Sequence, residues 1–210
     1  MENYFLQGEE ILKTLQGEGK RPKLLLHSCC APCSSAVIQK LKEYFDITVY
    51  YYNPNISPVE EYEKRKAEQK RLLALWHIPL MECDYEGDRY ENAVKGLENE
   101  PERGKRCDVC FALRLKKTAL TAKEGGYDYF CTTLTVSPHK NAELLNRIGK
   151  QEGERVGVTF LPSDFKKQNG YLTSIRLAKE LGLYRQDFCG CAYSKAQREK
   201  EKAQTERIEK

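Results

Sequence analysis

The most constraining stretch of the chain is Cys29-Cys30-Ala31-Pro32-Cys33, which places three thiols within five residues. The apolar run before it, Leu24-Leu25-Leu26-His27-Ser28, is typical of a buried strand, and residues 34–41 favour a helix. The thiols are therefore expected where a strand is followed by a helix N-terminus, whose N–H groups and positive dipole favour thiolates. Packing alone does not explain such a cluster, and we expect it to hold part of a metal centre.

The cysteine content supports this interpretation. Nine cysteines occur among the 210 residues, and an odd number cannot pair completely in disulfides. The N-terminus is polar and carries no secretory signal, and no apolar stretch reaches the roughly 18–20 residues of a membrane span. We therefore expect a cytoplasmic protein without a membrane partner, in which clustered cysteines bind metal or do redox work. The net charge of +4 permits a nucleic-acid partner without requiring one.

Short β-type runs alternate with helical patterns along the chain. Strands are predicted at 24–29, 47–52, 79–83, 129–133 and 158–161, and helices at 33–44, 58–76, 88–98, 107–123, 141–151 and 167–181. This order predicts an α/β fold, a Rossmann-like doubly wound parallel sheet of about five strands. Ligands of such sheets bind beyond the carboxyl ends of the strands, where the cysteine turn falls. The turn replaces the GxGxxG motif of an ordinary dinucleotide site.

Three regions of different character follow from these patterns. Residues 1–22 are polar and are expected to form a peripheral N-terminal segment with a short helix over 9–15. Residues 23–194 are expected to form a single α/β metalloenzyme domain with the metal site at the carboxyl ends of the strands. Residues 195–210 alternate Lys and Arg with Glu and Gln, which indicates a charged C-terminal helix or tail.

Three cysteine clusters carry the candidate chemistry: Cys29, Cys30 and Cys33; Cys107 and Cys110; and Cys189 and Cys191. The CxxC spacing of the second cluster, at a predicted helix start, lets two thiolates face one metal, in a zinc site, an iron–sulfur site or a redox pair. Adjacent cysteines such as the first two are unusual for tetrahedral zinc and are easier to place on two irons of a cluster. In the third cluster an intervening glycine lets the backbone turn.

A count of thiolates suggests how these clusters combine. The adjacent pair and the CxxC motif supply four, enough for a cubane cluster or a structural zinc. Cys33 with Cys189 and Cys191 supplies three more, which leaves room for a second metal or an open position. Cys83 and Cys131 fall in predicted strands, where a free cysteine usually behaves as a small buried hydrophobic residue.

Other residues are candidates for supporting roles. His27 precedes the adjacent cysteines and could tune a cluster by hydrogen bonding. His139 follows the fourth strand and is a candidate substrate contact. Basic residues beside the CxxC motif and after the fifth strand are candidate phosphate contacts: Arg103, Lys105, Arg106, Lys166 and Lys167. The aromatic residues Tyr50, Tyr51, Tyr52 and Trp76 could stack on a base, but their spacing favours core packing.

Seven stretches together resemble one known family over roughly residues 22–194. They are Leu26-His27-Ser28-Cys29-Cys30-Ala31-Pro32-Cys33; Tyr52-Asn53-Pro54-Asn55-Ile56 with Glu60-Glu61-Tyr62; Arg106-Cys107-Asp108-Val109-Cys110 with Leu113-Arg114-Leu115; Thr132-Thr133-Leu134 with Ser137-Pro138-His139-Lys140-Asn141; Phe165-Lys166-Lys167 with Gly170-Tyr171; Leu181-Gly182-Leu183-Tyr184-Arg185-Gln186; and Phe188-Cys189-Gly190-Cys191. The chain thereby resembles QueH, the cobalamin-independent epoxyqueuosine reductases of queuosine biosynthesis.

The resemblance implies a bacterial cytoplasmic enzyme that reduces epoxyqueuosine in the anticodon loop of tRNA to queuosine. It also implies two cofactors, a [4Fe–4S] cluster and an additional mononuclear iron. Carried over to this chain, the cluster ligands would be Cys29, Cys30, Cys107 and Cys110, and the ligands of the extra iron would be Cys33, Cys189 and Cys191. Some relatives carry Asp at the position of Cys33, and a carboxylate would also suit iron.

This chemistry needs two electrons, two protons and a group that activates the epoxide oxygen. An external electron donor such as ferredoxin or flavodoxin is expected, and the candidate proton donors are Asp108, Tyr184, Asp187 and His139. Two other functions remain open from the residues alone. One is a zinc-stabilised nucleic-acid-binding module without catalysis, and the other is a thiol–disulfide oxidoreductase that uses the redox-active pair Cys107 and Cys110.

Overall fold

A five-stranded parallel sheet forms the centre of the computed structural model, which describes residues 2–208. The strands are β1 (Lys23–His27), β2 (Asp46–Tyr50), β3 (Leu80–Met81), β4 (Tyr129–Thr132) and β5 (Thr159–Phe160), in the order β3-β2-β1-β4-β5. Every neighbouring pair is parallel. The order reverses on either side of β1, so the predicted doubly wound α/β fold is confirmed.

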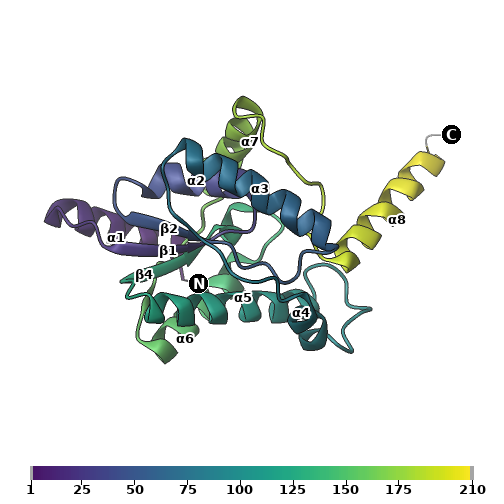
Figure 1. The fold of residues 1–210 in the computed structure, drawn as a ribbon, viewed down its shortest axis with the longest axis horizontal. Helices are drawn as coiled ribbons and strands as arrows, with labels where there is room; N and C mark the ends of the chain where they lie inside the picture. Colours follow the sequence, from purple (N-terminus) through teal and green to yellow (C-terminus); the bar gives the residue numbers. More distant parts are fainter. Residues whose placement is uncertain (1, 209–210) are drawn as a thin grey trace.

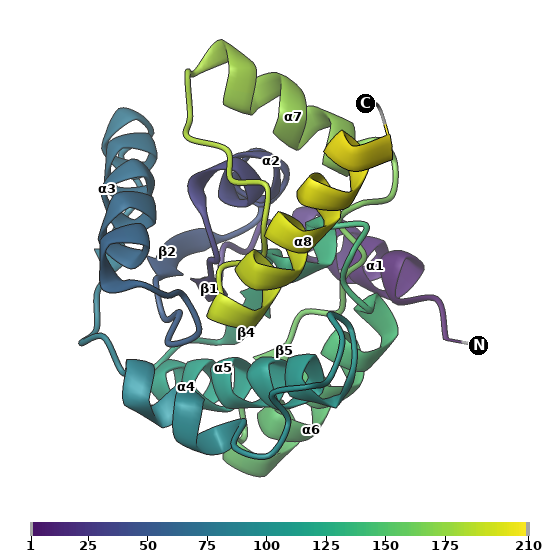
Figure 2. The same ribbon diagram turned by 90° about the vertical axis from the view of Figure 1, so that its right-hand side faces the viewer.

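Helices cover both faces of the sheet (Figure 1). One face carries α1 (Tyr4–Glu18), α2 (Ala31–Leu41), α3 (Val59–Leu75) and α7 (Gly170–Glu180), and the other carries α5 (Lys105–Glu124) and α6 (Ala142–Val156). The short helix α4 (Gly87–Ala93) lies beside α5. The last helix, α8 (Ala192–Ile208), projects from the body, and Figure 2 views the molecule from that side.

Alternation of side chains along the central strand explains the two layers. Leu24 and Leu26 of β1 pack into the core under α1 and α2, whereas Leu25, between them, packs with Phe111 and Leu115 of α5. All three leucines are fully buried. Since both faces of β1 are covered, its sequence is continuously apolar rather than alternating.

Several predicted boundaries differ from the structure. The N-terminal helix is longer than expected and adds Leu12 and Leu15 to the main core. Gly8 permits this packing, because a Cβ there would lie 2.4 Å from the carbonyl oxygen of Pro162. The helix predicted over 88–98 ends at Ala93, since Gly96 takes a left-handed conformation with φ 84°.

Further differences concern the ends of strands. Cys83 lies after β3 rather than in it, while Cys131 lies in β4 and is fully buried as predicted. A 3₁₀ helix, Thr133–Val136, follows β4, where no helical pattern is present in the residues. The charged C-terminal helix predicted over 195–210 is present as α8, and residues 209–210 lie outside the described residues. Over residues 2–208, none of the helices combines the length and apolarity needed to cross a membrane.

The last residues of β1, β2 and β4 lie side by side at one edge of the sheet. His27, the last residue of β1, pairs in register with Tyr50 of β2 on one side and with Thr132 of β4 on the other. The cysteine turn therefore leaves the sheet between two neighbouring strand ends, at the switch point where ligands of this fold bind.

Candidate metal centre

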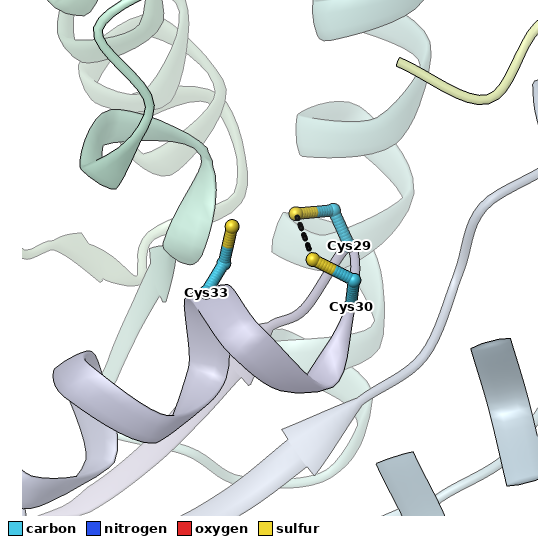
Figure 3. A group of neighbouring side chains, drawn as sticks. All are labelled: Cys29, Cys30 and Cys33. Atoms are coloured by element: carbon cyan, nitrogen blue, oxygen red, sulfur yellow. Dashed lines mark hydrogen bonds between the residues drawn. The ribbon is translucent and has the colours of Figure 1, made fainter. Parts of the chain in front are cut away.

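Three thiols converge where β1 passes into α2; we call Cys29, Cys30 and Cys33 the thiol trio (Figure 3). Their sulfurs all lie within 4.8 Å of one another, and the Sγ atoms of Cys29 and Cys30 are 3.7 Å apart. Cys30 occupies the N-cap position of α2 in an extended conformation, so Cys33 stands in the first helical turn and points back to the turn. Pro32 fits there because its missing N–H has no partner at a helix start.

The three thiols of the trio differ in pKa. Hydrogen bonds from the thiols of Cys30 and Cys33 hold the pKa of Cys29 well below its usual range. The contacts with Cys29 and Cys30 raise the pKa of Cys33 well above its usual range, and the contact with Cys29 together with burial raises the pKa of Cys30 to about 12. The backbone N–H of Cys29 donates to Thr133 Oγ1 at 3.3 Å. The trio therefore combines one thiolate with two neighbouring thiols. A metal ion that bound to the thiolate could displace the protons of the other two.

Three buried polar side chains, two next to the turn and one from α3, fix the backbone of this turn. The Ser28 hydroxyl donates to Gln69 Oε1 at 2.8 Å, and the Ser34 hydroxyl donates to the carbonyl oxygen of Cys30 at 3.0 Å. Both serines and Gln69 are completely buried. The trio therefore rests on a rigid support that is mostly local in sequence.

Four more cysteines form a second group, the thiol quartet, made of Cys107, Cys110, Cys189 and Cys191. The first two stand on the opening turn of α5, and the last two on the segment that leads into α8. Cys110 and Cys191 pack in one buried cluster with Tyr90 and Val94. The charges of Cys189 and Cys191 also act on the thiol of Cys107. Two pairs that are about eighty residues apart in the sequence thus lie near each other, whereas the thiolate count had combined each pair with cysteines of the trio.

The 181–191 segment carries Cys189 and Cys191, and side chains of α3 hold this segment in place. Arg65, which is 2% exposed, donates from Nη1 to the carbonyl oxygen of Cys189 at 3.0 Å. Its Nε donates to Glu61 Oε1 at 2.6 Å, and Tyr184 Oη donates to the same carboxylate at 3.2 Å. Arg71 and Glu68 of α3 hold the start of the segment.

Gly190 is required at its position in this segment. Its φ of 129° lies in the region that favours glycine, and a Cβ would meet Arg65 Nη1 and Ile56 at 3.0 Å. Its carbonyl oxygen accepts a hydrogen bond from the N–H of Ser57 at 2.9 Å. The glycine between the two cysteines therefore allows both the turn and the close approach of α3.

Two buried cations face the thiols. Lys140 Nζ lies 2.8 Å from Cys189 Sγ and 3.8 Å from Glu102 Oε1. Burial lowers the pKa of Lys140, but the negative charge of Cys189 raises it more, so the side chain stays an ammonium. Arg114 Nη1 lies 3.9 Å from Cys110 Sγ, and its charge also acts on Cys29 and Cys189. Arg114 thus faces one thiol of the trio and two of the quartet.

The donor set fits a thiolate-bound metal centre. All nine cysteines are free, and seven of them belong to the trio and the quartet. Cys29 and Cys107, one from each group, pack against the same buried cluster around Tyr52 and Phe111. Thiolates select zinc and iron–sulfur clusters, and buried cations would offset the negative charge that such ligands bring. The remaining pair, Cys83 and Cys131, lies apart from these groups with its pKa values raised by burial.

The four candidate proton donors lie in different surroundings. Tyr184 lies on the 181–191 segment and donates to Glu61, with Lys64 Nζ 3.6 Å from the centroid of its ring. Asp187 pairs with Lys202 of α8 at 2.5 Å, which lowers the pKa of its carboxyl group. His139 is exposed, with Nδ1 2.6 Å from Arg103 Nη2.

Asp108, the fourth candidate, is exposed on the first turn of α5 between the two thiols of the CxxC motif. Two of the four, Tyr184 and His139, are linked to the quartet through described contacts. From Tyr184 these contacts run through Glu61 and Arg65 to the backbone of Cys189. From the exposed His139 they run through Arg103, whose backbone N–H donates to Cys107 Sγ at 3.2 Å.

The predicted nucleic-acid contacts comprise a set of aromatic residues and a set of basic residues. Tyr50, Tyr51 and Tyr52 are at most 2% exposed, so the expected core packing is confirmed. Arg106 is also 2% exposed and donates to the carbonyl oxygens of Leu97 and Glu98, so its prediction as a phosphate contact is wrong.

The other basic candidates stay near the surface. Arg103, Lys105 and Lys167 are exposed, and Lys166 pairs with Asp164 at 2.5 Å. Trp76 is half-buried and packs against two core clusters, which favours the packing role over base stacking.

Sequence reasoning did not single out the supporting charges Arg65, Arg114 and Lys140 as site residues. For Arg114 a signal exists, since it stands four residues after Cys110 and seven after Cys107 and thus on the same face of α5. For His27, a predicted hydrogen-bond donor to the centre, the structure shows other partners: its Nε2 lies 3.0 Å from the carbonyl oxygen of Tyr52 and its Nδ1 lies 2.9 Å from Thr132 Oγ1.

Comparison with known proteins gives a consistent result. The family model described as "Epoxyqueuosine reductase QueH" matches residues 24–197. The epoxyqueuosine reductase QueH of Streptococcus pyogenes serotype M1 is 42% identical over 198 residues, covering 91% of this chain and 78% of the relative. The one from Thermotoga maritima is 36% identical over 187 residues, covering 88% and 96%.

Among solved structures, the chain is similar to the U34-tRNA thiolase NcsA from Methanococcus maripaludis with its [4Fe-4S] cluster. The TM-score is 0.58 at 15% sequence identity, and the match covers 90% of this chain and 67% of that one. At this identity the similarity concerns the fold, and it supports the α/β architecture described above.

Proposed function

The chain belongs to the epoxyqueuosine reductase QueH family and is an oxidoreductase of queuosine biosynthesis, and we propose how its residues serve that reaction. The reaction removes the epoxide oxygen of epoxyqueuosine and leaves the alkene of queuosine, with two electrons and two protons consumed and water released. The observation that carries the proposal is the family match over residues 24–197, which spans the whole trio and the whole quartet.

We assign two cofactors to the seven thiols. Cys29, Cys30, Cys107 and Cys110 would hold a [4Fe–4S] cluster, and Cys33, Cys189 and Cys191 would hold an additional mononuclear iron. When bound, such centres would supply electrons one at a time and, at an open iron position, Lewis acidity toward the epoxide oxygen. The closeness of Cys33 to Cys29 and Cys30, within 4.8 Å, supports neighbouring positions for the two metals.

The protein's own groups prepare this site for negative charge. Lys140 holds its ammonium against Cys189, and Arg114 holds its guanidinium among thiols of both groups. Both cations are buried, so solvent screens them little. Each would favour the thiolate form of the cysteines it faces.

Tyr184 is the proposed proton donor among the four candidates. Tyr184 is half-buried and its hydroxyl is bound to Glu61, whereas Asp187 is paired with Lys202 of α8. Replacing Tyr184 with Phe should lower turnover by about 10²-fold or more, the usual contribution of general acid catalysis. Asp187→Asn, Asp108→Asn and His139→Gln should each change turnover far less.

The proposed substrate is tRNA that carries epoxyqueuosine in its anticodon loop. The exposed Arg103 and Lys105, beside the CxxC motif, and Lys167, before α7, are suited to phosphate contacts. A modified base must leave the stacked loop to reach the thiols. We further propose an external one-electron donor of the ferredoxin or flavodoxin class and a location in the bacterial cytoplasm.

Anaerobic purification and reconstitution test the proposal. The loaded enzyme should be brown with absorbance near 400 nm. With a chemical reductant it should convert epoxyqueuosine in tRNA to queuosine, measured by mass spectrometry of the digested nucleosides. The matched control is Cys83→Ala, which removes a thiol outside both groups and should leave colour and activity intact.

Other outcomes would support the alternatives. A colourless protein with stoichiometric zinc and no turnover would indicate a zinc-stabilised nucleic-acid-binding module. A metal-free protein that reduces disulfides through Cys107 and Cys110 would indicate a thiol–disulfide oxidoreductase. Either result contradicts the proposed cofactors.

A further inference from the structure

Arg114 is a buried cation that pairs with no carboxylate among the described residues. It stands one turn after Cys110 on α5 and is 2% exposed. Its side chain reaches inward to the ends of β1 and β2, where Nη2 donates to Asn53 Oδ1 at 2.6 Å and Nε lies 3.3 Å from His27 Nε2. The third contact is Cys110 Sγ, at 3.9 Å from Nη1.

The partners at the ends of the strands carry no charge. Asn53 is an amide, which also donates from Nδ2 to the carbonyl oxygen of Ser28. Burial, and then the charge of Arg114, lowers the pKa of His27 to about 3, so its imidazole is neutral at physiological pH. The anionic groups that act on Arg114 are the sulfurs of Cys110, Cys29 and Cys189.

Such a charge needs fixed partners inside the protein. Removing a guanidinium from water is unfavourable by several kcal/mol even after the protein relaxes, and arginine does not escape this by losing its proton. Two other arginines are equally buried: Arg65 is paired with the carboxylate of Glu61, and Arg106 is bound by three backbone carbonyl oxygens. Among the described residues, the groups that offer negative charge to Arg114 are thiols.

We propose that Arg114 is the permanent counter-charge of the cluster held by Cys29 and Cys110 and that it raises the reduction potential of that cluster. The inference rests on the proposed function, because it requires the cluster. Arg114 is a positioning residue here, since it acts through the ligands and touches no reacting atom.

The sign of the effect follows from charge. A [4Fe–4S] core with four thiolates carries two negative charges when oxidised and three when reduced. A nearby fixed cation stabilises the more negative form more strongly, and burial strengthens the interaction. The wild-type guanidinium therefore makes the cluster easier to reduce by an external donor.

The test is a spectroelectrochemical titration of the reconstituted full-length protein. Arg114→Gln removes the charge while keeping an amide that can bond to Asn53, and Arg114→Lys keeps the charge. Thr118→Val is the matched control, because Thr118 is completely buried one turn further along α5 and its hydroxyl donates only to the backbone oxygen of Arg114.

For Arg114→Gln we expect the ratio of reduced to oxidised cluster at a fixed potential to fall at least tenfold, which is a midpoint about 59 mV lower for a one-electron couple. Arg114→Lys and Thr118→Val should stay close to wild type. If Arg114→Gln fails to hold a cluster while Arg114→Lys holds one, the requirement for charge is also supported.

Three results would overturn the inference. A wild-type midpoint in Arg114→Gln would show that the charge does not act on the cluster. Loss of the cluster in both Arg114 variants but not in Thr118→Val would show that the shape of the guanidinium matters and its charge does not. Absence of a cluster in the wild type would overturn the proposed cofactors, and this inference with them.

Discussion

The thiol trio and the thiol quartet are assembled in different ways. The trio comes from one five-residue turn. Its supports Ser28 and Ser34 are its immediate neighbours in sequence, and Gln69 of α3 is the one distant support named above. The quartet joins two segments that are distant in sequence, and it depends on side chains of α3 and on Lys140. The comparison teaches that one strand-to-helix turn can present three thiols with little help from distant segments, whereas the other four need the tertiary fold. We therefore expect the two groups to respond differently to substitution.

The largest effect is expected within the trio. Cys30 is 2% exposed at the N-cap of α2 and is a proposed cluster ligand, so Cys30→Ala should abolish both the absorbance near 400 nm and all turnover. The spectrum of the anaerobically reconstituted variant and the nucleoside assay measure this. A variant that keeps its colour would remove Cys30 from the cluster ligands.

A substitution in the quartet should separate colour from activity. Cys189→Ala should abolish reduction but retain most of the cluster absorbance, with one iron fewer per chain than the wild type. The physical reason is that Cys189 is assigned to the additional iron. Loss of the whole cluster in this variant would break the proposed division of the ligands.

The quartet should also be sensitive to a residue that carries no sulfur. Arg65→Met removes the bond to the backbone of Cys189 and leaves Glu61 buried without its cation, which should lower the free energy of unfolding by about 3–5 kcal/mol. The additional iron should be lost before the cluster is. Denaturant titration and iron analysis measure both effects.

Arg71 provides the matched control on the same helix. It also donates to backbone oxygens of the 181–191 segment, but it is exposed. Arg71→Met should therefore cost less than about 1 kcal/mol. Equal losses for Arg65→Met and Arg71→Met would show that the buried attachment has no special role in holding Cys189.

The smallest expected effect concerns the glycine between the two last cysteines. Gly190→Ala forces a φ of 129° on a residue with a Cβ and should cost about 1–3 kcal/mol. Gly17→Ala in α1, where nothing lies within 4 Å of the added Cβ, should be neutral or slightly stabilising. Thermal unfolding of both variants makes the comparison, and an unchanged midpoint for Gly190→Ala would contradict the close packing against Arg65.

The sequence predicts those parts of the molecule whose cause is local. The apolar run before Cys29 and the helical pattern after Cys33 are enough to place the trio at the end of a central strand. The alternation of strands and helices is enough to predict the doubly wound sheet. Burial of Tyr50, Tyr51 and Tyr52 is expected for the end of a parallel strand that is covered on both faces.

The parts that sequence reasoning missed depend on contacts between distant segments. Arg106 looked like a solvated charge in a basic loop, but the turn over 97–100 folds back and offers it three carbonyl oxygens. Arg65 meets Cys189 across 124 positions of the chain. No local pattern reports such a pairing, because it exists only after the sheet has placed α3 beside the 181–191 segment.

The most direct test of the central claim is a quantification of iron, acid-labile sulfide and zinc in the anaerobically reconstituted protein. The seven thiols are proposed to serve two metal positions, a [4Fe–4S] cluster and one further iron, each of which takes ligands from both the trio and the quartet. The predicted result is four sulfides and one iron in excess of sulfide per chain, with no stoichiometric zinc. Equal amounts of iron and sulfide, or stoichiometric zinc without sulfide, would contradict the account.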